Sequence, residues 1–298
     1  MNRYLTSVLV FVFSVGALYA EQPIPFSHHV IIIAEENHSY GSVIGNSSMP
    51  YFNGLANKYG SAKNYYANIN GSLKDYLMMT GGSLFTSYYC GGRGCSRTVQ
   101  GDNLVRHLLL GGVTWKAYLE SLPYSGYMGY QSGYYDKWHN PFAWYSDIAW
   151  SSEKYRMVGL DKLLTDLKND TLPAFSYILP NAVHDAYLGS LGAADKWLSQ
   201  YVPQILANPG FQKDGILIIV FDEGTPNVDK SCSATVSTGC GGHVATLVIG
   251  PRVKRGYKSW TYHQHQAVLR SVIQALGISK YGYPGLSAKT ANMGEFFF

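Results

Sequence analysis

The sequence is poor in charged residues and lacks the common phosphate loops. Charged residues make up 14% of its 298 positions, well below the usual quarter, and the formal net charge is only +4. So small and dispersed a positive excess argues against nucleic-acid binding and leaves a mild preference for anionic substrates. GxxxxGK[ST] and GxGxxG segments do not occur, and neither do internal repeats or low-complexity linkers.

An apolar run long enough to cross a bilayer comfortably is missing as well. The N-terminus instead has a positive charge at Arg3, an apolar stretch over 5–15 and small residues within 17–20, which is typical of a secretory signal peptide. We predict cleavage after Ala20, a secreted or periplasmic protein without a stable membrane span, and one catalytic domain over residues 21–298. The alternative is an uncleaved N-terminal anchor.

Cysteine is also scarce, since the chain contains only Cys90, Cys95, Cys232 and Cys240. They form two local pairs among glycine and polar residues. In an oxidising compartment this spacing favours two disulfides, Cys90–Cys95 and Cys232–Cys240, and the other two connectivities stay open. A zinc site is disfavoured because the spacings do not match the usual zinc knuckles and no histidine is suitably placed.

Carboxylates follow two apolar runs at the point where each run ends. Residues 30–37 read VIIIAEEN, and residues 215–223 read GILIIVFDE. Fully apolar runs of this kind are typical of buried strands in a parallel sheet. Open α/β sheets bind ligands beyond the carboxyl ends of their strands. The two acidic strand ends therefore predict a shared metal site.

Apolar strands alternate with amphipathic segments along the chain, which favours a parallel sheet with helices on both faces. We predict strands at residues 30–33, 173–180, 215–221 and 244–249. Helices are predicted at residues 50–60, 72–79, 103–110, 114–121, 156–168, 192–207 and 264–276. Long loops are expected at residues 80–101, 123–151 and 225–242. The predicted fold class is α/β, a three-layer α/β/α sandwich with a mostly parallel central sheet.

Ser72 follows an Asn-Gly pair at a predicted helix start, where backbone N–H groups favour an anion. Hard divalent cations take oxygen ligands, and a hydroxyl in such a shell loses its proton more easily and becomes a nucleophile. His139, His184 and His243 lie in loop-like segments, where an imidazole can protonate a leaving oxygen or hold phosphate oxygens. By pattern alone, Ser72 is equally a plain helix cap.

Short polar motifs occur along the chain in a definite order. They are Glu36-Asn37-His38-Ser39, Ser72-Leu73-Lys74-Asp75-Tyr76-Leu77, His139-Asn140-Pro141-Phe142, Pro180-Asn181 with His184-Asp185, Phe221-Asp222-Glu223, and the segment 242–251. This order resembles the phosphoesterase family, which contains bacterial phospholipases C and secreted acid phosphatases within the alkaline phosphatase superfamily. The resemblance covers residues 30–276; each motif alone is weak, and their ordered combination is fairly specific.

The resemblance implies an alkaline-phosphatase-like fold and in-line attack of Ser72 on phosphorus, with a phosphoserine intermediate that water hydrolyses. It also implies a divalent metal ion, Mg, Mn, Ca or Zn, with oxygen ligation favouring the harder ions. The implied ligands of that ion are Glu36, Asn37, Ser72, Asp222 and Glu223. The implied phosphate-binding or general-acid residues are His139, His184 and, on a looser match, His243.

Two positions depart from the family pattern. An Asn-Gly pair precedes the predicted nucleophile where the family often has His-Pro, and Lys74 replaces a frequent proline. Because of these departures, no imidazole contact is expected from position 70. The substrates of the family also cannot be assigned directly to this chain. Three other residues keep structural readings: Glu35 as a strand end, Asn37 as a turn cap, and Asp185 as a turn cap or as the partner that orients His184.

The predicted function is a secreted, metal-dependent acid phosphatase that hydrolyses phosphate monoesters, with a small-molecule or lipid ester as substrate. A phospholipase C or phosphodiesterase of the same family is the alternative. A non-catalytic secreted binding protein is disfavoured because the nucleophile and the acidic ligands are present. A sulfatase is disfavoured because Ser72 lacks the C/S-x-P-x-R context of that class. The oligomeric state is not readable from the sequence.

Overall fold

The computed structural model describes residues 21–85, 98–225 and 240–298. The predicted signal peptide lies outside these ranges, and so do Cys90, Cys95 and Cys232. The leader and the pairings Cys90–Cys95 and Cys232–Cys240 therefore stay predictions, as does the assignment of the mature chain to one catalytic domain.

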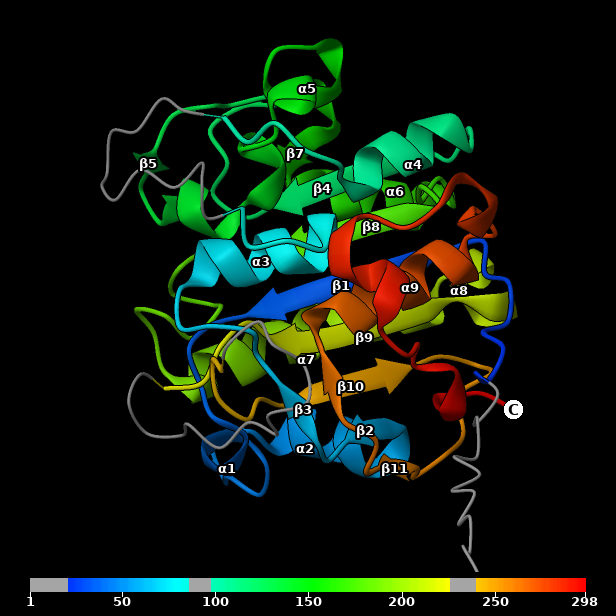
Figure 1. Cartoon of the computed structure of the whole chain (residues 1–298). Coiled ribbons are helices and arrows are strands. Elements are labelled where there is room, and N and C mark those ends of the chain that lie inside the picture. The colour runs from blue at the N-terminus through cyan, green and yellow to red at the C-terminus, as the bar shows by residue number, and fades with distance from the viewer. Residues whose placement is uncertain (1–20, 86–97, 226–239) are drawn as a thin grey trace, which may run out of the picture.

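A β-sheet runs through the middle of the molecule (Figure 1). In the described ranges its eight strands follow the order β11 (Lys258–Ser259), β2 (Gly60–Ala62), β10 (Thr246–Ile249), β9 (Ile216–Phe221), β1 (Val30–Glu35), β8 (Phe175–Leu179), β4 (Trp115–Leu119) and β7 (Met157–Gly159). The strands from β9 to β7 are parallel, whereas β10 runs antiparallel to both β9 and β2. The prediction of a mostly parallel sheet is confirmed.

The centre of the sheet is apolar on both faces. All six residues of β1 are buried, and so are all six of β9, because helices cover both sides of a parallel sheet. The two strands pair in parallel with Glu35 opposite Phe221, so they end at the same edge. The next residues, Glu36 and Asp222, are therefore delivered side by side beyond the carboxyl ends of the strands, where α/β folds bind ligands.

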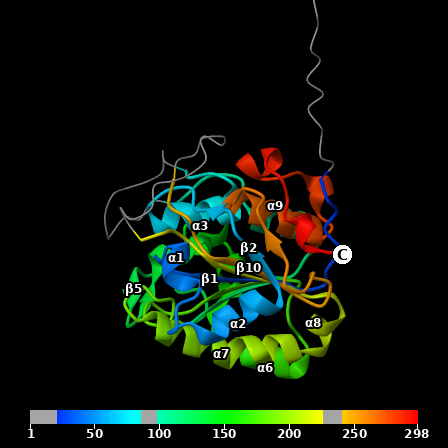
Figure 2. The ribbon, with the colours of Figure 1, turned by 90° about the horizontal axis from the view of Figure 1, so that it is seen from below.

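Helices form a layer on each face of the sheet. One layer contains α3 (Ser72–Gly81), α4 (Leu104–Leu110) and α9 (His265–Ala275), and the other contains α2 (Pro50–Lys58), α6 (Asp161–Asn169) and α7 (Leu191–Ala207). Figure 2 separates the two layers, with α3 and α9 above the sheet and α2, α6 and α7 below it. The predicted three-layer α/β/α sandwich is confirmed.

Two segments differ from their predicted structure. Residues 114–121, predicted as a helix, contain strand β4, in which Trp115 and Tyr118 are buried. Pairing with β8 on one side and β7 on the other decides the conformation there, and aromatic residues fit a strand well. Residues 156–168, predicted as one helix, contain strand β7 and form helix α6 only from Asp161.

The described parts of the chain also contain shorter elements. They are helices α1 (Tyr40–Val43), α5 (Ser146–Ala149) and α8 (Pro209–Asp214), and the strand pairs β3 (Tyr65–Tyr66) with β12 (His263–Gln264) and β5 (Gln131–Ser132) with β6 (Tyr135–Asp136). The elements β5, β6 and α5 fall in the stretch 123–151, which was predicted to be a loop. Among the helices described, none is long and apolar enough to cross a membrane.

Candidate active site

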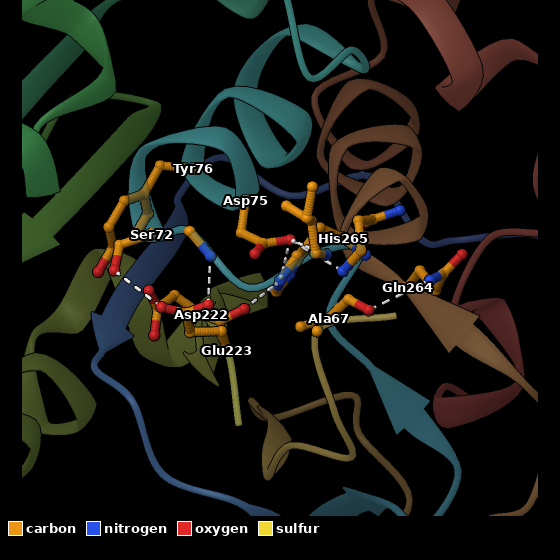
Figure 3. Close-up of polar contacts among 12 residues, drawn as sticks. Ala67, Ser72, Asp75, Tyr76, Asp222, Glu223, Gln264 and His265 are labelled. Atoms are coloured by element: carbon orange, nitrogen blue, oxygen red, sulfur yellow. Dashed lines mark hydrogen bonds and ion pairs between the residues drawn. The ribbon is translucent and has the colours of Figure 1, made fainter. Parts of the chain in front are cut away.

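Helix α3 begins beside the carboxyl ends of the central strands (Figure 3). Its first residue is Ser72, and Gly71 before it has a φ of 152°, a value that residues with a side chain rarely adopt. The N–H of Gly71 donates a hydrogen bond to Glu223 Oε2. Glycine at position 71 thus allows the sharp entry into α3 that places Ser72 next to the carboxylates.

The hydroxyl of Ser72 lies between two carboxylates. Ser72 Oγ is 3.0 Å from Glu36 Oε2 and 3.3 Å from Glu223 Oε1. One turn further along α3, the phenol of Tyr76 donates a hydrogen bond of 2.5 Å to Glu36 Oε1. Glu36 is fully buried, so these two hydroxyls fix its carboxylate in place. In this arrangement the proton of the Ser72 hydroxyl has two carboxylate acceptors at hand, which is what the predicted nucleophile requires.

The remaining predicted metal ligands lie at the same place. The backbone N–H of Asn37 donates to Asp222 Oδ1 at 2.9 Å. Asn37 has a φ of 52°, a left-handed conformation that asparagine tolerates better than most residues. Asn37 Oδ1 and Asp222 Oδ2 are buried and lack a hydrogen-bond partner. Two oxygen acceptors in this cluster therefore remain available for a ligand.

Burial makes the charged forms of these carboxylates costly. It raises the pKa of Glu36 well above the usual value, and the charges of Asp222 and Asp185 raise it further. Burial likewise raises the pKa of Asp222 to about 6 and, together with the charge of Asp222, that of Glu223 to about 7. Protons or a bound cation must offset the charge of such a cluster.

The donor set fits a hard divalent cation. No group of three or more His, Cys, Asp or Glu side chains in the described ranges is already arranged to hold a metal ion. The cluster nevertheless offers carboxylate, amide and hydroxyl oxygens, two of which are buried without partners. Oxygen ligands with several carboxylates are what Mg²⁺, Mn²⁺ and Ca²⁺ prefer. The residues present fit the predicted ion by their chemistry.

His139 is the imidazole that reaches this cluster. It ends a 3₁₀ turn (Lys137–His139), and its Nε2 lies 3.6 Å from Glu36 Oε1. Its Nδ1 is 2.9 Å from Asp185 Oδ2. Burial lowers the pKa of His139, but the hydrogen bond and charge of Asp185 outweigh burial and raise it. Asp185 therefore orients His139, and not His184 as one reading of the sequence had it.

The other two predicted histidines have different surroundings. His184 is partly exposed, and its Nδ1 is 2.9 Å from both carboxylate oxygens of Glu120. His243 stacks between the rings of Tyr40 and Tyr66, and its Nε2 is 3.1 Å from the carbonyl of Lys63. The structure joins neither ring to Ser72 by these contacts, so their catalytic roles stay predictions.

A pocket of about 290 Å³ opens in front of Ser72. Of the predicted histidines, His139 is the one at its wall in the described part of the chain. The lining residues are Asn70, Gly71, Ser72, Leu73, Lys74, Asp136, Trp138, His139 and Tyr187. A serine hydroxyl, an imidazole and a lysine thus meet in one cavity that Trp138 and Tyr187 also line, which suits an anionic ester carrying an organic group.

The sequence profile of the phosphoesterase family matches residues 46–279. The chain belongs to the phosphoesterase family. A phosphatidylinositol-3-phosphatase of Mycobacterium tuberculosis is 28% identical to it over 269 residues, covering 89% of this chain and 82% of that protein. A probable acid phosphatase of Kluyveromyces lactis is 26% identical over 253 residues, covering 81% of this chain but only 56% of that protein.

A solved structure has the same fold as this phosphoesterase. A protein of the alkaline phosphatase superfamily from Vibrio parahaemolyticus superposes with a TM-score of 0.55 over 86% of this chain and 69% of that chain, at 11% identity. The predicted alkaline-phosphatase-like fold is thereby confirmed. The family and the names of the relatives place the chain among hydrolases that act on phosphoric esters.

Two residues of the phosphoesterase site were missed or misassigned from sequence. Tyr76 donates a hydrogen bond to Glu36. Its spacing of four from Ser72 puts both residues on one helix face, so the sequence could have indicated that Tyr76 belongs to the site. Asp185 and His139 are hydrogen-bonded although they are 46 positions apart in the sequence, and no local sequence pattern predicts that pairing. Glu35, by contrast, is buried with both carboxylate oxygens unpartnered, so it is not the solvated strand end that the sequence also allowed.

Proposed function

We propose that this chain is a secreted, metal-dependent acid phosphatase that hydrolyses phosphate monoesters through Ser72. The observation that carries the proposal is the Ser72 hydroxyl, which lines an open pocket while Glu36 and Glu223 hold it at 3.0 and 3.3 Å. The phosphatase names of the relatives support the reaction class, and the predicted family roles support the nucleophile.

In the first step Ser72 gives its proton to Glu36 or Glu223 while its Oγ attacks phosphorus in line with the leaving oxygen. The Oγ–P bond forms as the bond between phosphorus and the leaving alcohol breaks. Lys74 lines the pocket and supplies positive charge for the transferring oxygens, and the N-terminus of α3 adds to it. The product of this step is a phosphoserine.

His139 transfers two protons: it protonates the leaving group in the first step and accepts a proton from water in the second step. The imidazolium donates its proton to the departing alkoxide, and the neutral ring then accepts a proton from the water that attacks the phosphoserine. Asp185 holds the ring by its Nδ1, which leaves Nε2 directed to the site. As the water oxygen bonds to phosphorus, the Oγ–P bond breaks and Ser72 Oγ takes back the proton that Glu36 or Glu223 held, so phosphate leaves and His139 is protonated again.

The cation belongs to the proposal as a resident cofactor. Glu36, Asn37, Ser72, Asp222 and Glu223 would hold it, and when bound it would stabilise the serine alkoxide and the charge on the phosphoryl oxygens. Its identity is Mg, Mn, Ca or Zn, with the oxygen ligands favouring the harder ions. By the family resemblance, His184 and His243 remain candidates for phosphate binding or for the general acid.

A comparison of monoester and diester substrates tests the proposed function. Purified mature protein with added Mg²⁺ or Mn²⁺ should give a higher kcat/KM on p-nitrophenyl phosphate than on bis(p-nitrophenyl) phosphate. Excess chelator should remove the activity, and a divalent ion should restore it. Faster turnover of the diester would favour the phosphodiesterase or phospholipase C alternative. Absence of release from folded, metal-loaded protein would favour a non-catalytic binding protein.

The Asp185→Asn variant should shift the basic limb of the kcat/KM profile to lower pH. Without the carboxylate, burial dominates and the pKa of His139 falls, so less enzyme carries the proton that a leaving alkoxide needs. The shift should be large with glycerol phosphate, a poor leaving group, and small with p-nitrophenyl phosphate, which needs little protonation. If the basic limb of the kcat/KM profile on glycerol phosphate lay at the same pH in the variant and the wild type, His139 would not be the general acid.

Secretion is the part of the proposal that rests on the sequence alone. It is supported by the charge at Arg3, the apolar stretch after it and the small residues before Glu21. Sequencing the N-terminus of protein recovered from the periplasm or the medium tests it.

A further inference from the structure

A buried carboxylate lies directly behind the proposed nucleophile. Asp75 is three residues after Ser72 in α3 and is fully buried. Its Oδ1 accepts hydrogen bonds from the backbone N–H groups of Asn68 at 2.8 Å and Ile69 at 3.2 Å. These two residues begin the turn that leads through Gly71 into α3. Asp75 therefore anchors the inner side of that turn, while Glu223 holds its outer side at Gly71.

His265, the first residue of α9, connects this anchor with the end of β9. Its Nε2 is 2.6 Å from the carbonyl oxygen of Asp222 and 3.5 Å from Asp75 Oδ1, and its Nδ1 is 3.0 Å from the phenol of Tyr65. A carbonyl oxygen can only accept, so Nε2 carries a hydrogen. Figure 3 shows Asp75 and His265 facing each other, to the right of Ser72 and above Asp222 in that view.

Further buried amides tie α9 to the same turn. The backbone N–H of His265 donates to Asn68 Oδ1 at 3.3 Å, and Asn68 Nδ2 donates to Gln266 Oε1 at 2.9 Å. Gln264 Nε2 donates to the carbonyl of Ala67 at 3.3 Å. All of these side chains are at most 1% exposed. Such a network holds one arrangement of the backbone, because any displacement leaves buried polar groups unpaired.

We propose that Asp75 and His265 are a positioning pair that fixes Ser72 relative to Asp222. Neither side chain lines the pocket, so both act through the backbone that carries the reacting groups. Asp75 sets the turn before Ser72, and His265 sets the carbonyl of Asp222 and thereby the direction of its carboxylate. The inference rests on the proposed function, because the pair matters for catalysis only if Ser72 is the nucleophile.

The chain contains a matched control for this role. Asp195 in α7 is also buried and also accepts two consecutive backbone N–H groups, those of Phe52 at 2.7 Å and Tyr51 at 3.0 Å. It joins α7 to the start of α2, in the layer opposite α3 (Figure 2). Removing the Asp195 side chain thus removes two similar buried hydrogen bonds to the backbone but leaves the turn before Ser72 unchanged.

The experiment compares Asp75→Ala, Asp75→Asn and Asp195→Ala by thermal melting and by kcat and KM for p-nitrophenyl phosphate in metal-loaded enzyme. Asp75→Ala should lose about 100-fold in kcat, the scale that misplacement of a reacting atom by ~1 Å produces, with KM little changed. Asp75→Asn keeps an acceptor oxygen and should recover most of kcat. Asp195→Ala should melt earlier but keep kcat per folded molecule.

His265→Phe provides an independent arm, which carries the test alone if Asp75→Ala does not fold. It should lower kcat with KM little changed, and combining it with Asp75→Ala should cost no more than the worse single variant, because residues that act as one unit are not additive. Wild-type kcat in folded Asp75→Ala and His265→Phe, or equal losses in Asp75→Asn and Asp75→Ala, would overturn the pair. Activity retained in Ser72→Ala would instead remove Ser72 as the nucleophile of the proposed function, an outcome distinct from failure of the pair.

Discussion

The Ser72→Ala variant should lose hydrolysis of p-nitrophenyl phosphate by about 10³-fold or more while remaining folded. Ser72 begins α3, and its hydroxyl is bonded to Glu36 and lies near Glu223. Alanine removes the only atom of the side chain that can attack phosphorus, but it preserves the helix and the pocket. We expect kcat to fall at saturating divalent ion and the acid-stable phosphoenzyme, trapped with labelled substrate, to disappear.

Ser190→Ala is the matched control for that loss. Ser190 also stands at a helix start, where its side chain accepts a hydrogen bond from the N–H of Ala193, and its replacement removes only a cap worth about 1 kcal/mol. Its kcat should stay at the wild-type value. Full turnover in Ser72→Ala would contradict the assignment and would make a water molecule the attacking group.

The metal-ligand candidates could be predicted because their signal is local. An apolar run predicts a buried strand, and a carboxylate at its end lies where α/β sheets bind ligands. The sequence could not state that β1 and β9 are neighbours. Their pairing, with Glu35 opposite Phe221, turns two separate strand ends into one cluster. Adjacency in a sheet is a long-range property that neither strand encodes alone.

The histidines were harder to predict because each lies in irregular chain. Three imidazoles matched the family order, His243 more loosely than the other two, and of these His139 reaches Glu36. The same limit applies to Asp185, which sequence proximity paired with His184 and the fold pairs with His139. It applies to strand β4 too, since pairing with β8 and β7 outweighs a local helical pattern. Local reasoning fails where contacts between distant segments decide.

Without a divalent ion, the stability of this protein should fall as the pH rises. Burial raises the pKa of Asp222 to about 6 and that of Glu223 to about 7. Groups with raised pKa values stabilise the fold fully below their unfolded values, and this stabilisation is lost as the pH rises through 6 and 7. Melting of chelated protein from pH 4.5 to 8 should show this decline. A divalent ion at a hundredfold excess over its Kd should restore about 2.7 kcal/mol at pH 7.5.

The Asp222→Asn variant should reverse both effects at once. Without one of the crowded charges, the metal-free protein should melt at a higher temperature than wild type at pH 7.5, yet it should lose the response to divalent ions and most of its activity. Asp214→Asn is the matched control: hydrogen bonds from His28 outweigh burial and lower the pKa of Asp214, so its loss should destabilise the protein and leave the metal response intact.

A lower melting temperature for metal-free Asp222→Asn would mean that direct contacts of Asp222, such as the bond from Asn37, outweigh charge repulsion. If a divalent ion raised the melting temperature of Asp222→Asn as much as that of wild type, Asp222 would not be a metal ligand. Replacing a carboxylate that binds the ion by a neutral amide must weaken the binding.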